Sequence, residues 1–279
     1  MDPRLNGLNL KTSLSALLDL VLPRVCVVCG RPLLPQERHL CLECLSDLPL
    51  TRYAGLARNP MADRFNAAIQ VDEYEPYAYA AALYHYRAEA GYKKISQALK
   101  YHRDFGAGRW ASRLLGARLA ASPLYADVDL VVPVPLHWTR RWARGYNQAA
   151  VIAREVAKEL GVPHAPGLLR RRRRTRSQTR LSGADKTANV AGAFALRKGW
   201  RDPRPLRFFS PFFSLPRRGK SGPAPAGTLS GSAPALRHIL LIDDVFTTGA
   251  TLAACHRALR AVLGPQVRIS VATLGVVGE

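Results

Sequence analysis

The fold is decided by one stretch, Ile239–Thr251, which has the sequence ILLIDDVFTTGAT. Its first four residues are apolar, as expected for a strand that is buried on both faces of a sheet. A pair of carboxylates, a turn rich in threonine and glycine, and an apolar-periodic helix over Leu252–Leu263 follow. Because such a turn combines free backbone N–H groups with the positive end of a helix dipole, the stretch predicts an anion-binding site.

The side chains of this stretch indicate which anion would bind. The threonine hydroxyls add hydrogen-bond donors, and Gly249 lets the backbone approach a phosphate closely. Asp243 and Asp244 would repel a bare phosphate, so we expect them to hold sugar hydroxyls or a metal-linked group. A ribose 5-phosphate offers both a phosphate and sugar hydroxyls; the alternative is an ordinary turn with a capping threonine and a solvated acid pair. The predicted phosphate-binding residues are Thr247, Thr248, Gly249, Ala250 and Thr251.

These residues closely resemble the binding motif for phosphoribosyl pyrophosphate (PRPP) in type I phosphoribosyltransferases. The resemblance implies the fold of those enzymes and binding of PRPP with Mg²⁺. If the protein is an enzyme, it implies displacement of pyrophosphate from the ribose C1, with Asp243 and Asp244 as catalytic residues that hold the 2′ and 3′ hydroxyls. The alternation of strands and helices along the chain independently predicts an α/β fold, in which helices flank a mostly parallel sheet.

A second candidate loop follows the short apolar strand predicted over Val128–Val132. Ligands of open α/β sheets bind at the carboxyl ends of the strands, so the two loops could face one ligand. We expect this proline-stiffened loop to direct backbone N–H groups at a pyrophosphate and Arg144 to add a guanidinium. The alternative is a strand ended by proline and followed by a solvated basic turn. The predicted pyrophosphate-binding residues are Pro133, Val134, Pro135, Arg144 and Asn147.

Further motifs narrow the resemblance to the ComF/GntX-type phosphoribosyltransferase-like family. They are Val-Pro-Val-Pro-Leu over 132–136, Arg-Gly-Tyr-Asn-Gln over 144–148 and Leu-Lys-Tyr over 99–101, together with a four-cysteine module. For some members the resemblance implies a role in DNA uptake during natural transformation. Two features depart from the family pattern. Lys186 stands where the family usually has an arginine ahead of an Asn-Val pair, and residues 199–235 have no counterpart.

The four-cysteine module consists of two Cys-x-x-Cys pairs with eleven residues between them. Each pair can present two thiolates to one ion, so two pairs complete a tetrahedral site without an open position. Structural Zn²⁺ is the expected occupant; iron and, in an oxidising compartment, two disulfides are the alternatives. Gly30, directly after the first pair, stands where a left-handed residue is often needed. The predicted ligands are Cys26, Cys29, Cys41 and Cys44.

The charge of the 279-residue chain is strongly positive, since 41 Lys and Arg face 20 Asp and Glu and give a formal net charge of +21. This balance favours polyanionic partners, although a genome of high GC content would also enrich arginine without any binding role. Five consecutive arginines occupy 170–174, in a segment predicted to be a loop over 170–180. The cluster has three interpretations: a solvated face, a mobile catalytic flap, or a groove for single-stranded DNA. The nucleic-acid candidates are Arg171, Arg172, Arg173 and Arg174.

Two units are expected along the chain. Residues 1–62 form an amphipathic N-terminal helix and the cysteine module, and residues 63–279 form the phosphoribosyltransferase-like domain, in which 63–86 predict one or two strands. Residues 199–235, rich in Pro, Gly, Ser and Arg, predict a disordered insertion. No apolar run reaches the length of a membrane span and Leu14–Leu22 lacks a cleavage site, so we expect a cytoplasmic protein without membrane insertion.

These patterns together predict a PRPP-binding protein of ComF type that acts with DNA-uptake machinery. Whether it catalyses phosphoribosyl transfer is left open by the sequence, because no acceptor site is legible. The alternative is a non-catalytic protein that binds single-stranded DNA and keeps a sensing or vestigial PRPP site.

Overall fold

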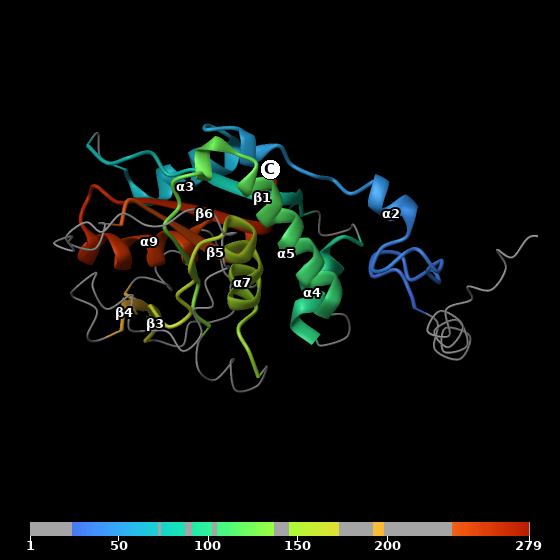
Figure 1. The fold of residues 1–279 in the computed structure, drawn as a ribbon. Coiled ribbons are helices and arrows are strands. Elements are labelled where there is room, and N and C mark those ends of the chain that lie inside the picture. Colours follow the sequence, from blue (N-terminus) through green and yellow to red (C-terminus); the bar gives the residue numbers. More distant parts are fainter. Residues whose placement is uncertain are drawn as a thin grey trace, which may run out of the picture.

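The computed structural model describes residues 24–71, 74–86, 91–101, 105–136, 145–172, 192–197 and 236–278. Within them, four parallel strands form the central sheet (Figure 1). In spatial order these are β1 (Ala80–His85), β6 (Arg268–Val276), β5 (His238–Phe246) and β2 (Leu130–Pro133). Helices cover both faces of the sheet. The predicted fold class, a mostly parallel α/β sheet with a small N-terminal cysteine module, is therefore confirmed.

The two faces can be followed along β5, where successive side chains point in opposite directions. Ile239 and Leu241 belong to one buried cluster, and Leu240 and Ile242 belong to the other; all four are fully buried. This burial on both faces explains the continuous apolar run in the sequence. The first cluster includes α3 (Pro60–Ile69) and α9 (Ala250–Leu263), and the second includes α4 (Lys93–Tyr101), α5 (Phe105–Ala120) and α7 (Gln148–Leu160).

Helix α3 corrects part of the prediction of one or two strands over 63–86, since residues 63–69 belong to this helix and, among the described residues of that range, Ala80–His85 form the one strand. Asn59 caps the helix by accepting a hydrogen bond from the Ala62 N–H at 2.9 Å, and Pro60 occupies the first turn. Met61, Phe65 and Ile69 then follow at helical spacing and are buried. These start signals lie just before the tyrosine-rich segment that suggested strands. The predicted division of the chain at residue 62 falls within α3.

A separate antiparallel pair corrects the start of the basic loop predicted over 170–180, of which 173–180 lie outside the described residues. Residues Leu169–Arg171 form β3, which pairs with β4 (Phe194–Leu196). Arg170 and Arg171 are thus strand residues, paired in register with Ala195 and Phe194. Arg144, Arg173, Arg174, the N-terminal segment 1–23 and the predicted insertion 199–235 lie outside the described residues. Within the described part of the chain, no helix is both long and apolar enough to cross a membrane.

The cysteine module lies beside α4, at the opposite end of the molecule from α9 (Figure 1). It contains the short helix α2 (Leu42–Ser46), and two 3₁₀ turns, Tyr53–Gly55 and Pro123–Tyr125, lie farther along the chain. The Lys94 ammonium of α4 donates a hydrogen bond to the Val28 carbonyl at 2.9 Å. The buried side chains of the module share one cluster with Ile95 and Leu99 of α4. Direct packing thus joins the module to the α/β domain.

Candidate phosphate site and zinc module

The two predicted phosphate loops lie side by side because β2 and β5 are adjacent and parallel. Pro133 is in register with Ile242, and the Val134 N–H donates to the Ile242 carbonyl at 2.8 Å. Since parallel strands end at the same edge of a sheet, the residues after Pro133 and the acid pair after Ile242 emerge together. This juxtaposition links segments more than one hundred positions apart in sequence.

The acid pair lies within β5 rather than after it, because β6 continues the pairing beyond the apolar run. Asp243 is in register with Thr273, and the strand ends only at Phe246. Both carboxylates are half-buried. The Asp243 carboxylate accepts a hydrogen bond from the Asp244 N–H, and the Asp244 carboxylate accepts one from the Val245 N–H, each at 2.9 Å. The acids are therefore held locally at the sheet edge, with part of each side chain open to solvent.

The turn after β5 depends on Gly249, which precedes the first residue of α9. Its φ of 76° lies in the left-handed region, and a Cβ there would lie 2.8 Å from the Phe246 ring. Both observations require glycine. Thr247 is exposed, Thr248 is half-buried, and the Ala250 N–H contacts the Thr248 hydroxyl at 3.5 Å. The turn thus delivers hydroxyls and a helix N-terminus to the edge that carries the acid pair.

Arg64 of α3 holds this turn in place, a role that the sequence did not indicate. One terminal nitrogen donates to the Val277 carbonyl at 2.9 Å and the other donates to the Thr247 carbonyl. The guanidinium carbon also lies 5.3 Å from the centre of the Phe246 ring. Arg64 and Thr247 are 183 positions apart, so no local pattern could connect them.

The proline turn was expected to direct backbone N–H groups at a pyrophosphate, and it does not have the donors for this. Neither Pro133 nor Pro135 has an N–H, and the Val134 N–H is used in the sheet. These three residues therefore have no backbone donor left for a pyrophosphate. The Asn147 amide donates to the Val134 carbonyl at 2.9 Å, so this side chain fastens the start of α7 to the turn. Of the predicted donors for this anion, Arg144 lies outside the described residues.

A basic pocket of about 840 Å³ adjoins the proline turn. It lies between α5, α7 and β3, and its wall includes Pro135, Leu136, Gly145 and Asn147. The acid pair is not part of this wall. Arg154, Arg170 and Arg197 are exposed. The arginines that line the pocket are Arg109, Arg154, Arg170, Arg171 and Arg197.

Among the described residues that line this pocket there is one carboxylate, Glu155, and its charge is already neutralised. Its side chain is 2% exposed and lies 3.0 Å from Arg109, 2.9 Å from Arg113 and 3.6 Å from Lys158. Burial would raise the pKa of Glu155, but hydrogen bonds from Arg113 and Arg109 outweigh burial and lower it. Of the arginines predicted to bind nucleic acid, Arg171 lines the pocket, whereas Arg172 is exposed just beyond β3.

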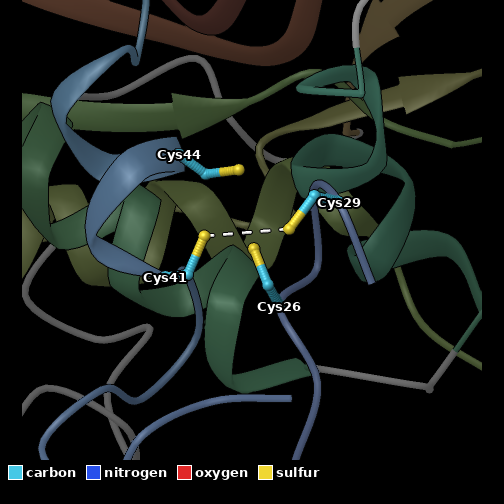
Figure 2. A group of neighbouring side chains, drawn as sticks. All are labelled: Cys26, Cys29, Cys41 and Cys44. Atoms are coloured by element: carbon cyan, nitrogen blue, oxygen red, sulfur yellow. Dashed lines mark hydrogen bonds between the residues drawn. The ribbon is translucent and has the colours of Figure 1, made fainter. Parts of the chain in front are cut away.

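The four predicted zinc ligands converge on one point (Figure 2). Their sulfur atoms all lie within 4.8 Å of one another, and the Cys29 and Cys41 sulfurs are 3.7 Å apart. A tetrahedral Zn²⁺ with bonds of about 2.3 Å holds its sulfurs about 3.8 Å apart, so the spacing fits that ion. A hydrogen bond from the Arg31 backbone lowers the pKa of Cys29 to about 6, which favours the thiolate.

The backbone around the cysteines supports the same geometry. Gly30 adopts the expected left-handed conformation with a φ of 82°, and its N–H donates to the Cys26 carbonyl at 2.8 Å. Arg31 forms a bidentate ion pair with Glu43, which connects the first cysteine pair to α2. With every sulfur directed inward, the cluster supports a structural role for Zn²⁺.

These features define an α/β protein with a parallel sheet and an N-terminal four-cysteine module. The module is matched by a family model described as a double zinc ribbon domain, over residues 17–54. This match covers all four cysteines and supports structural zinc.

More of the chain is matched by individual curated proteins. It is 27% identical over 169 residues to competence protein F of Haemophilus influenzae, a match that covers 60% of each chain. It is 29% identical over 146 residues to the DNA utilization protein YhgH of Salmonella typhi, which covers 52% of this chain and 48% of that protein. The matches thus span only about half of the relatives' length. They confirm the predicted resemblance: the chain is a homologue of competence protein F and of YhgH proteins.

Proposed function

We propose that the edge formed by β5 and β2 binds PRPP. The observation that carries this proposal is the register of Pro133 with Ile242, which brings the two predicted loops to one edge. The conformation of Gly249 and the clamp by Arg64 support a rigid anion-binding turn. An anion at the start of α9 would be favoured by the helix dipole and by the threonine hydroxyls.

Each group at the edge has a role in this proposal. The 5-phosphate is bound by the turn residues Thr247, Thr248, Gly249, Ala250 and Thr251. The half-buried carboxylates accept hydrogen bonds from the ribose hydroxyls. In a transfer reaction, Asp243 and Asp244 would also stabilise the positive charge that develops on the ribose. Carboxylate oxygens suit Mg²⁺ as well, and this ion would neutralise charge on the leaving pyrophosphate.

The pyrophosphate end of the site is formed differently from the 5-phosphate end. Because Pro133, Val134 and Pro135 have no backbone donor to offer, Arg144 and the start of α7 supply the positive charge. Asn147 acts through Val134, whose carbonyl it binds, and so positions the turn rather than the ligand.

We further propose that the protein acts in DNA uptake or DNA utilization. The names of its relatives, competence protein F and DNA utilization protein YhgH, support this role. The basic pocket favours a second candidate function, in which the protein binds single-stranded DNA without catalysing transfer and the PRPP site senses its ligand or is vestigial.

Titration calorimetry with PRPP and Mg²⁺ tests the proposal directly. Wild-type protein should bind PRPP, and the Asp243→Asn/Asp244→Asn variant should not. Ribose 5-phosphate should bind more weakly than PRPP, since it lacks the pyrophosphate. Release of pyrophosphate from PRPP, followed by a coupled assay, would then distinguish an enzyme from a sensor. Equal affinity of wild type and variant for PRPP would contradict the site.

A further inference from the structure

The basic pocket and the candidate pyrophosphate turn share part of their wall. Pro135 and Leu136 after β2, and Gly145 and Asn147 before α7, line the pocket. From this turn the pocket extends past α7 to β3, where Arg170 lies on the strand and Arg197 follows β4. It is therefore a continuous cationic surface with the turn at one end.

The charge of the pocket exceeds what one pyrophosphate requires. Among the described residues, five arginines and one carboxylate line it, and this carboxylate, Glu155, is held by Arg109, Arg113 and Lys158. Phosphodiester backbones are recognised by such rows of guanidinium groups, because each arginine neutralises a phosphate and releases counterions.

Aromatic side chains lie beside these charges. Phe105 and Tyr146 line the pocket and meet edge to face, with their ring centres 5.3 Å apart. The Tyr146 hydroxyl donates to the Leu99 carbonyl, which fixes the ring on α4. Bases of single strands stack on aromatic rings next to basic grooves, whereas paired bases are not free to do so.

We propose that a single-stranded nucleic acid occupies this pocket and that its backbone reaches the proline turn, so that nucleic acid and PRPP exclude each other there. The exclusion rests on the proposed PRPP site; the strand site rests on the pocket alone. Two phosphate groups cannot share one turn, because their like charges repel at short distance. PRPP would thereby act as a small-molecule competitor that releases the strand.

The strand site is tested with a fluorescent oligothymidylate, whose anisotropy is followed at several salt concentrations. Arg154→Gln/Arg197→Gln removes two exposed pocket arginines. On the relation of about 0.7 per phosphate contact, the variant should lower the slope of log affinity against log salt by about 1.4. Arg52→Gln/Arg58→Gln removes the same charge from exposed positions outside the pocket and should leave the slope unchanged. Equal slopes for wild type and pocket variant would overturn the strand site.

The exclusion is tested by competition on the wild-type protein. PRPP and inorganic pyrophosphate should each displace the oligothymidylate, whereas ribose 5-phosphate at matched ionic strength should not. If PRPP binds by calorimetry while the strand stays bound at saturation, the shared turn is wrong and the PRPP site stands. If PRPP does not bind but pyrophosphate displaces the strand, the proposed function is wrong and the shared turn stands. A strand displaced by neither PRPP nor pyrophosphate overturns the exclusion in every case.

Discussion

Strand β5 carries a polar cluster at each end, and the two clusters differ in their access to solvent. At its start, the His238 ring is bound on both sides, 2.7 Å from the Asp127 carboxylate and 2.7 Å from the Ser270 hydroxyl. The imidazole and the hydroxyl are closed to solvent, since His238 and Ser270 are both 0% exposed, whereas the Asp127 side chain is 44% exposed. At its end, Asp243 and Asp244 are half-exposed and bind the backbone of the next residue.

This difference shows that access, rather than residue type, separates a structural cluster from a binding site. Asp127, His238 and Ser270 have the order of hydrogen bonds found in catalytic triads. However, the Ser270 hydroxyl also accepts a hydrogen bond from the Tyr79 N–H at 3.1 Å, and no substrate can reach it through the surrounding core. The carboxylates at the other end form a less distinctive set of hydrogen bonds, but they lie at a sheet edge that is open to solvent. We therefore assign stability to the start of β5 and ligand binding to its end.

Removal of the buried imidazole should give the largest loss of stability. His238→Ala leaves the Ser270 hydroxyl without its ring partner and opens a cavity beside Tyr125, so we expect the free energy of unfolding to fall by about 3 kcal/mol. PRPP affinity should stay within about twofold, because the ring lies at the opposite end of the strand. Urea denaturation and calorimetry measure both quantities. A large loss of PRPP affinity in a folded variant would contradict the claim that the two ends of β5 have separate roles.

Gly249→Ala should have an intermediate effect on stability. The new Cβ would meet the Phe246 ring at 2.8 Å in a left-handed residue, which we expect to cost about 2 kcal/mol and to weaken PRPP binding at least about tenfold. Gly161→Ala is the matched control, since Gly161 has a φ of 68° in the same left-handed region but open space around it. The control should lose about 1 kcal/mol and bind PRPP normally. Equal PRPP affinities in the two variants would remove the special role of Gly249.

The pH dependence of stability should show a smaller effect of His238 on the free energy of unfolding. Burial lowers the pKa of His238, although Asp127 opposes this shift, so the unfolded chain binds the proton more readily than the folded protein. The stability contributed by the neutral His238 ring is complete above the ordinary histidine pKa of about 6.5 and is lost as the pH falls below that value. Between pH 7 and 5.5, wild type should lose more stability than His238→Ala.

The same comparison controls for other buried histidines. Burial also lowers the pKa of His256, to about 3, and that of His164, and both residues remain in the variant. Their contributions therefore cancel in the difference between the two proteins. Urea denaturation at both pH values gives this difference, and parallel pH profiles for wild type and His238→Ala would contradict a neutral buried imidazole.

The acid pair should contribute least to stability and most to binding. Asp243→Asn/Asp244→Asn should change the free energy of unfolding by less than about 0.5 kcal/mol, since both side chains are partly exposed at the sheet edge and each accepts a hydrogen bond from the backbone of the next residue. PRPP binding should be lost. Thermal denaturation with calorimetry measures both, and a variant that unfolds much more easily would show that these acids hold the fold.

The sequence predicted the parts of the molecule that depend on short-range patterns. The β5 strand, its glycine turn and α9 follow from one continuous stretch, and the zinc module follows from the spacing of its cysteines. Helix α3 was missed although Asn59 and Pro60 are local start signals, because the tyrosines farther along suggested strands. That error came from weighing composition above capping.

The remaining features depend on contacts that no local pattern encodes. Asp127 and His238 are 111 positions apart, and Arg64 reaches Thr247 across 183 positions. The donors of the proline turn were misjudged for a related reason, since the Val134 N–H is used by a neighbouring strand that is distant in sequence. Only the register of β2 with β5 shows which groups at the edge are occupied.

Hydrogen–deuterium exchange with and without PRPP and Mg²⁺ tests the central claim most directly, because it locates binding along the chain. We expect PRPP to slow exchange in peptides that cover Thr247–Thr251 at the open end of β5. Peptides that cover Tyr125–Asp129 and Arg237–Ile239, at the buried end, should exchange at the same rate with and without ligand. Protection at the buried end, or none at Thr247–Thr251 in the presence of saturating PRPP, would contradict the account.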